Sequence, residues 1–559
     1  MSATILMLLG LGGMALGYFV YSAFIARRVY GLDPDFETPA HAYEDGVDYV
    51  PTNRFVLWGH HFTSVAGAAP IVGPAIAVIW GWLPAFLWVV IGTVFFAGMH
   101  DAGAIWASVR NRARSVGSLT GDVVGKRARS LFMIVIFLVL LMVNAVFAVV
   151  IAGLMMDFPS AVVPVWGAIA VALVIGQLIY RRMISLPVVS LLGVIALYAL
   201  IAVGPAVPLP MPDQVGGVSG NALWVLILFG YAGIASLLPV WMLLQPRDYI
   251  NGLQLFIGLI ILYGAVVLAN PAMVAPMFNQ QVPEGTPSLI PLLFVTIACG
   301  AISGFHGLVA SGTTSKQLNR ETDARFVGYF GAVGEGALAL AAILATAAGF
   351  ASLADWRGMY QAFGENGVGA FVQGGAYLIQ NGIGLPEATA STLLTVMTAL
   401  FAGTTMDTGL RLQRYIFQEW GDIYRLEWMK KPLPATLLAV GSCLLLAFGA
   451  GGADGSGGMI IWPLFGTTNQ LLAGLTLLVI CVMLVRRRRP IRYALVPLCF
   501  LLAMTILALL TQLKGFYSEG NYFLLCLDIV VLIASIFVAF EAASALRRQR
   551  REMLESPEA

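Results

Sequence analysis

The sequence predicts an all-α integral membrane protein that crosses the bilayer about fifteen times. The first observation is composition: of 559 residues, 59% are hydrophobic and 11% are charged. In soluble domains, about a quarter of the residues carry charge. The second observation is a series of apolar runs, each near the ~20 residues that a helix needs to cross the hydrocarbon layer. Together they exclude a water-soluble core, and the net charge of +2 gives no support to nucleic-acid binding.

The apolar runs give the expected spans in chain order. We expect helices at residues 3–25, 55–80, 83–108, 130–156, 161–180, 185–207, 221–244, 251–273, 288–312, 326–351, 388–410, 434–450, 458–485, 491–513 and 521–546. The first run lacks a basic region before it, so it is expected to be a retained helix rather than a signal peptide. Residues 367–383 are rich in glycine and are expected to form a re-entrant or interfacial segment.

Lysine and arginine clusters test this count, because they collect on the cytoplasmic side of a membrane protein. The clusters are Arg27/Arg28, 110–129, Arg181/Arg182, Arg247, 316–325, 411–431, 486–489 and 547–551. With an odd number of spans all of them fall on one side. The N-terminus is therefore expected outside and the C-terminus in the cytoplasm, with membrane lipid around the helices.

Two spans are interrupted by glycine and proline, at residues 65–74 and 229–239. A break frees backbone groups that cost several kcal/mol each in hydrocarbon, so it persists where it lines a cavity; a tolerated packing kink is the alternative. The second interruption lies five helices after the first, and the two spans run in opposite directions. This spacing is typical of a five-plus-five inverted repeat of the LeuT/APC type.

That architecture divides the chain. We expect an N-terminal helix and cytoplasmic loop at 1–50, a ten-helix transporter core at 51–425 with repeats near 51–210 and 218–425, and additional helices at 430–559. Alternating access around the two interruptions would then expose backbone groups to a small substrate. The substrate-binding candidates are Gly67, Ala68, Pro70, Gly73, Gly230, Tyr231, Gly233 and Ser236.

Ionisable residues at membrane depth are the next candidates, because they are costly there unless they function. They are His60, His61, His100, Asp101, His306, Glu335 and Asp407. Histidine beside a carboxylate can carry a proton or bind a metal. Proton coupling is favoured; hydrogen bonds between helices are the alternative, and for Asp407 an i,i+4 pair with Arg411. A metal site is weaker, because depth alone does not bring ligands within the ~2 Å that a metal needs.

Hydroxyl groups suggest sodium as the alternative coupling ion. Ser311, Thr313 and Thr314 end one span, and they could join the backbone of Ala66 around a hard cation. Helix capping is the structural alternative. The expected coupling ion is H⁺, with Na⁺ as the alternative, and no cofactor is expected.

These segments carry a resemblance. The matching stretches are residues 59–77, 80–84, 98–101, 311–317, 404–408 with Arg414-Tyr415, and 462–472. Together they resemble the carbon starvation protein A family of bacterial inner-membrane proteins. The resemblance implies a transporter, not an enzyme, in the inner membrane. It would take up peptides, or in some members pyruvate, during nutrient limitation, with the fold of the amino acid/polyamine/organocation superfamily.

Two rival functions remain at this point. A membrane metalloenzyme would use the histidines, but no HExxH-type spacing supports it. A nutrient sensor would need a soluble signalling domain, and the tail after Arg547 is short. Asn469 and Gln470, inside an apolar span, either reach the substrate or hydrogen-bond between helices.

Overall fold

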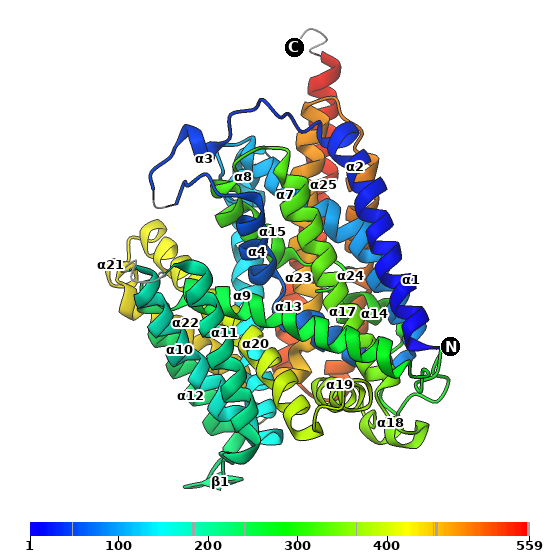
Figure 1. The fold of residues 1–559 in the computed structure, drawn as a ribbon. Helices are drawn as coiled ribbons and strands as arrows, with labels where there is room; N and C mark the ends of the chain where they lie inside the picture. The colour runs from blue at the N-terminus through cyan, green and yellow to red at the C-terminus, as the bar shows by residue number, and fades with distance from the viewer. Residues whose placement is uncertain are drawn as a thin grey trace.

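The computed structural model describes residues 1–555 except 47, 124, 181–184, 240–241, 365, 451 and 453–456. Arg181 and Arg182, which contributed to the charge pattern, lie outside the described residues. The described chain is a bundle of helices with one small hairpin, β1 (Gln214–Val215) and β2 (Val218–Ser219). The start of the first helix and the end of the last lie at opposite ends of this bundle (Figure 1).

In the described part of the chain, thirteen helical segments are long and apolar enough to cross a membrane. They are α1–α2 (Ala3–Tyr30), α6–α7 (Trp82–Val109), α9 (Lys126–Asp157), α10 (Val162–Tyr180), α11 (Leu186–Val203), α12 (Gly220–Leu237), α13 (Leu244–Ala269), α17 with its preceding turn (Arg325–Ala348), α20 (Glu387–Ile423), α22 (Pro432–Gly449), α23 (Gly458–Arg486), α24 (Arg492–Ser518) and α25 (Tyr522–Glu555). The chain is therefore a multi-pass, all-α membrane protein.

Shorter helices complete the fold. They are α3 (Pro39–Ala42), α4 (Arg54–Val65), α5 (Ala69–Ala77), α8 (Val116–Val123), α14 (Leu289–Thr296), α15 (Gly304–Val309), α16 (Ser315–Gln317), α18 (Leu353–Met359), α19 (Gly367–Ile383) and α21 (Glu427–Lys430). The segment from α4 through α5 to Trp80 passes the same test as one span bent by 50°, which gives up to fourteen. This bend confirms the predicted interruption at residues 65–74.

The predicted interruption at residues 229–239 is wrong. The chain is continuously helical from Gly220 to Leu237, with the Ser219 side chain accepting a hydrogen bond from the backbone N–H of Ala222 at its start. The helix ends at Leu238, where the backbone becomes extended ahead of Pro239. Glycines 230 and 233 therefore lie within a regular helix, which tolerates them at a modest cost.

The single span predicted at residues 288–312 is also wrong. Helix α14 ends at Thr296 and α15 begins at Gly304, with residues 297–303 outside any regular helix. Gly300 has φ +89°, a conformation that favours glycine. The second broken helix of this protein is thus α14–α15.

Residues 367–383 form a regular helix of 17 residues, α19, which packs against α5, α13, α17 and α20. Gly384, with φ +79°, ends it, and the chain turns directly into α20. In Figure 1, α18 and α19 lie at the same end of the bundle as the N-terminus.

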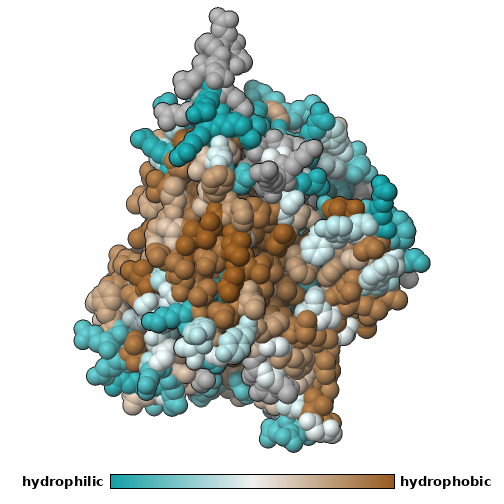
Figure 2. Space-filling view, turned by 180° about the vertical axis from the view of Figure 1, so that it is seen from behind, coloured by the Kyte–Doolittle hydropathy of each residue, from teal (hydrophilic) through white to brown (hydrophobic). Residues whose placement is uncertain are grey.

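The surface carries a broad apolar belt between two hydrophilic margins (Figure 2). Outer helices supply it: Leu8 and Leu16 of α1 and Phe540 of α25 are exposed by 61%, 65% and 68%. In contrast, the apolar window of α23 is completely buried. An apolar exterior around a central apolar helix is the arrangement expected of a protein surrounded by lipid.

Candidate functional site

The site is built where the two broken helices meet. The first break, residues 66–68, separates α4 from α5, and the second break, residues 297–303, separates α14 from α15. A Cβ placed on Gly73 of α5 would lie 2.5 Å from the carbonyl oxygen of Thr296, so the two backbones are in direct contact. A Cβ on Gly300 would lie 3.7 Å from Pro70. The two breaks therefore lie side by side.

The first break is held by close packing. The backbone N–H of Gly67 donates to the carbonyl of Val65, and Ala68 leads into α5 with Pro70 in its first turn. A Cβ on Gly67 would collide with the hydroxyl of Thr405 on α20. Of the predicted substrate-binding residues, Gly67 and Ala68 therefore lie in the break, and Pro70 and Gly73 lie in α5 directly after it.

The second break is held by side chains from two other spans, α6–α7 and α23. The indole of Trp88 donates to the carbonyl of Ile297 at 3.0 Å, that of Trp462 to Thr296 at 3.2 Å, and the hydroxyl of Thr93 to Gly300 at 3.1 Å. Asn469 accepts from the N–H of Phe305 at 3.0 Å, and Gln470 donates to Phe294. These bonds satisfy backbone groups that a break leaves free. The stretch 462–470 on α23 therefore hydrogen-bonds between helices.

The carboxylate of Asp101 lies between two histidines next to the second break. Its Oδ1 is 2.8 Å from Nδ1 of His100, and its Oδ2 is 2.8 Å from Nδ1 of His306. All three side chains are fully buried. Because an ionised carboxylate only accepts hydrogen bonds, an ionised Asp101 would accept one hydrogen bond from a protonated Nδ1 of each histidine.

Glu335 extends this arrangement to the backbone of the break. Its Oε2 lies 3.2 Å from Nε2 of His306, and its Oε1 accepts a 3.1 Å hydrogen bond from the N–H of Gly300. With Nδ1 of His306 occupied by Asp101, a further proton can reside on Nε2 of His306 or on Glu335. We call His100, Asp101, His306 and Glu335 the histidine–carboxylate cluster.

The two remaining histidine candidates, His61 and His60, have different surroundings. His61 on α4 is fully buried, and its Nδ1 is 2.9 Å from the hydroxyl of Thr314, while its Nε2 has no partner among the described residues. His60 is half-buried and takes no part in the histidine–carboxylate cluster. The structure therefore joins His61 to the segment after α15.

The hydroxyls proposed for a cation do not point to one centre. Ser311 donates to the carbonyl of Gly307 at 2.6 Å and accepts from the N–H of Val116, whereas Thr313 donates to Val309 on its own helix. Thr314 faces His61 rather than Ala66. Across the described residues, no group of three His, Cys, Asp or Glu side chains has the arrangement needed to hold a metal.

A second buried charge cluster lies where α12, α13 and α20 meet. Arg247 of α13 pairs with Asp407 of α20, and the hydroxyl of Tyr231 on α12 donates to the same carboxylate at 2.9 Å. Arg411 instead donates to the carbonyls of Ala235 and Leu238 at the end of α12. The alternative of an i,i+4 pair between Asp407 and Arg411 is therefore not what the structure shows, because each residue has a partner elsewhere. We call Tyr231, Arg247 and Asp407 the arginine–aspartate cluster.

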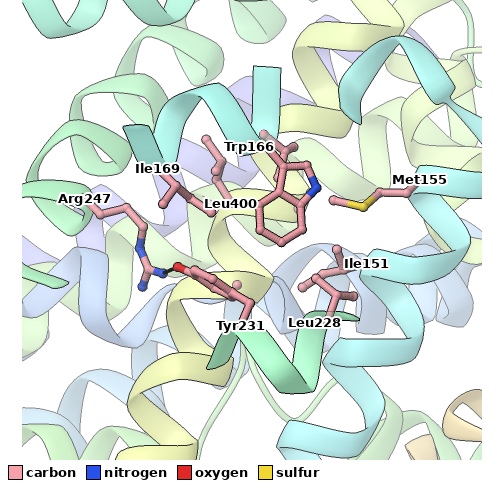
Figure 3. Close-up of a pocket in the computed structure, with 11 residues that line it drawn as sticks. Ile151, Met155, Trp166, Ile169, Leu228, Tyr231, Arg247 and Leu400 are labelled. Atoms are coloured by element: carbon pink, nitrogen blue, oxygen red, sulfur yellow. Dashed lines mark hydrogen bonds between the residues drawn. The ribbon is translucent and has the colours of Figure 1, made fainter. Parts of the chain in front are cut away.

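A small cavity adjoins this cluster (Figure 3). Tyr231 and Arg247 point toward one another at one side of it, with their hydrogen bond of 2.9 Å, and Trp166 meets the Tyr231 ring edge-on at 5.5 Å between centroids. The cavity volume is about 30 Å³, room for about one or two water molecules. Ser236 donates to Gly233 within α12. Of the candidates Gly230, Tyr231, Gly233 and Ser236, Tyr231 lines this cavity and the other three do not.

Sequence reasoning missed Arg247 as a site residue, having counted it only as a cytoplasmic charge. The side chain is 2% exposed and its charge is neutralised by Asp407. The sequence did contain a signal for it: Arg247 and Asp248 are adjacent near the start of a long apolar run. Paired charges at membrane depth indicate a functional or structural role. Thr93, a single hydroxyl in an apolar run, carried no comparable signal.

Comparison with known proteins gives a family profile and two relatives that share one family name. The sequence profile described as "Carbon starvation protein CstA" matches residues 2–362 and 346–508. The chain is 33% identical to the "Peptide transporter CstA" of Campylobacter jejuni, over 90% of this chain and 79% of that protein. It is 33% identical to the protein of the same name from Escherichia coli, over 88% and 78%.

A third relative has a different name. The "Pyruvate/proton symporter BtsT" of Escherichia coli is 31% identical, over 90% of this chain and 82% of that protein. The matches cover both broken helices, the histidine–carboxylate cluster and the α23 motif. This chain belongs to the carbon starvation protein CstA family.

Proposed function

We propose that this protein imports small peptides across a bacterial inner membrane by alternating access around the paired breaks, driven by protons. One observation supports the proposal above all: two broken helices touch beside a buried histidine–carboxylate cluster. Irregular backbone at membrane depth is characteristic of transporter binding sites, where it meets charged substrate groups. The names of the curated relatives agree with transport.

The core is proposed to be a five-plus-five inverted repeat, with a different assignment of helices to its two halves than the sequence predicted. The first half would be α4–α5, α6–α7, α9, α12 and α13, and the second half α14–α15, α17, α20, α22 and α23. The hairpin α10–α11 is then an insertion, and the core extends past residue 425 to Arg486. Contacts of α9 with α20 and of α12 with α22 support this frame, because equivalent helices of the two halves pack together.

The proton is proposed to act through Glu335. When Glu335 is ionised it accepts the N–H of Gly300 and faces a protonated His306. When the proton moves onto Glu335, its attraction to that N–H weakens, since hydrogen bonds to charged groups are the stronger ones. Proton loading would thereby change how firmly the second break is held. The proposed orientation in the membrane is the one that charge placement favours, with the N-terminus outside and the basic clusters in the cytoplasm.

Pyruvate is the second candidate substrate, because one relative is named a pyruvate/proton symporter. Both substrates present a carboxylate to the free backbone N–H groups of a break. Purified protein in proteoliposomes, given an inward proton gradient, separates them. We expect labelled dipeptide to accumulate, an uncoupler to abolish accumulation, and excess pyruvate not to compete. Accumulation of pyruvate alone would assign the second substrate, and uptake of neither would overturn the proposal.

A further inference from the structure

A groove at the end of the bundle opposite the N-terminus has a charged rim and an apolar wall. It lies where α23 ends, α24 begins and α25 leaves the bundle, and its volume is about 530 Å³. Arg488, Arg489 and Arg547 line the rim, and Val485, Ile491, Leu495 and Leu546 line the wall. None of the residues assigned to transport lines this groove.

The three arginines converge because three helix ends meet. Helix α23 ends at Arg486, a short turn carries residues 487–491, and α24 begins at Arg492, while Arg547 comes from near the end of α25. In Figure 2 the hydrophilic surface beneath the C-terminal end borders directly on the apolar belt. The groove lies where three membrane-crossing helices begin or end, and therefore at the margin of the apolar belt.

Within the described part of the chain, two of these arginines lack a carboxylate partner. Among the ion pairs of the described residues, neither Arg489 nor Arg547 takes part in one. Arg489 is packed against Gly31, where an added Cβ would strike its guanidinium group. One guanidinium is thus positioned by packing while its charge remains available to an anion.

We propose that this groove binds an anionic phospholipid. The phosphodiester accepts hydrogen bonds from Arg489 and Arg547, a pairing that suits the planar donors of arginine. The acyl chains follow Ile491, Leu495 and Leu546 into the belt. A free phosphate would contact the arginines but not the apolar wall, so the wall favours a lipid. Basic pockets between helices at the cytoplasmic face are suited to acidic headgroups.

Native mass spectrometry of the full-length protein, titrated with phosphatidylglycerol or phosphatidylcholine, tests this proposal. We expect phosphatidylglycerol to bind and phosphatidylcholine not to. The variant Arg489→Gln/Arg547→Gln should bind phosphatidylglycerol about thirtyfold more weakly, from the contribution expected of two arginines at a membrane surface. The control Arg112→Gln/Arg425→Gln removes two exposed arginines elsewhere and should bind as the wild type.

Three outcomes would overturn the proposal. They are equal losses in both double variants, equal binding of the two lipids, and complete displacement of phosphatidylglycerol by inorganic phosphate. The last would mean that the groove recognises a soluble anion. Thermal unfolding in lipid-free detergent should be the same for both variants, which separates lost binding from lost folding.

Discussion

The two buried charge clusters lie in regions of opposite character. The histidine–carboxylate cluster adjoins irregular backbone, and its Glu335 holds the second break through Gly300. The arginine–aspartate cluster adjoins regular helices, and its Arg247 and Asp407 neutralise one another. Both pay the cost of burying charge. Imidazole beside a carboxylate can pass a proton on, whereas arginine cannot be deprotonated in proteins. Only the histidine–carboxylate cluster is therefore suited to a region whose protonation and conformation change together.

The largest expected effect tests the arginine–aspartate cluster. Arg247→Met leaves Asp407 as a buried charge without its partner, which should cost about 3–5 kcal/mol of stability. Thermal unfolding of the purified variant measures it. The double variant Arg247→Met/Asp407→Leu should recover most of the loss, because both charges are then gone. Full wild-type stability in the single variant would show that the pair is not structural.

A smaller effect tests the contact between the breaks. Gly73→Ala places a Cβ 2.5 Å from the carbonyl of Thr296, and such overpacking costs about 1–3 kcal/mol. Uptake should fall as well, since the variant separates the two broken helices. Unchanged stability and unchanged uptake together would mean that the breaks do not need this contact.

The smallest effect uses a glycine in α12 as the matched comparison. Gly230→Ala adds a Cβ with no atom within 4 Å, inside a regular helix. It should stabilise the protein by about 0.5–1 kcal/mol. A loss of stability comparable to that of Gly73→Ala would instead contradict a regular helix with open space at Gly230.

The contrast between the regions also explains what the sequence could predict. Apolar runs and charge placement predicted nearly every span, because the hydrocarbon layer imposes one length on them all. The first break was predictable because Gly67, Pro70, Gly73 and Pro74 occur within ten residues. Depth alone also placed His100, Asp101, His306 and Glu335 at one level, and the structure brings these four together.

The second break was not predictable in the same way. Residues 297–303 contain no proline, and the break is held by Trp88, Trp462 and Asn469 from distant segments. Conversely, the glycines of α12 are accommodated in a regular helix whose last carbonyls bind Arg411 and Arg414. Local composition indicates where a helix can break, but tertiary hydrogen bonds decide where it does.

The most direct test of proton coupling compares exchange with accumulation in Glu335→Gln. The amide keeps the size of the side chain and can still accept from Gly300, but it carries no titrating proton. In proteoliposomes the variant should retain counterflow of labelled substrate against unlabelled substrate. It should lose accumulation driven by an inward proton gradient. Gradient-driven accumulation at the wild-type level would contradict a role for Glu335 in coupling.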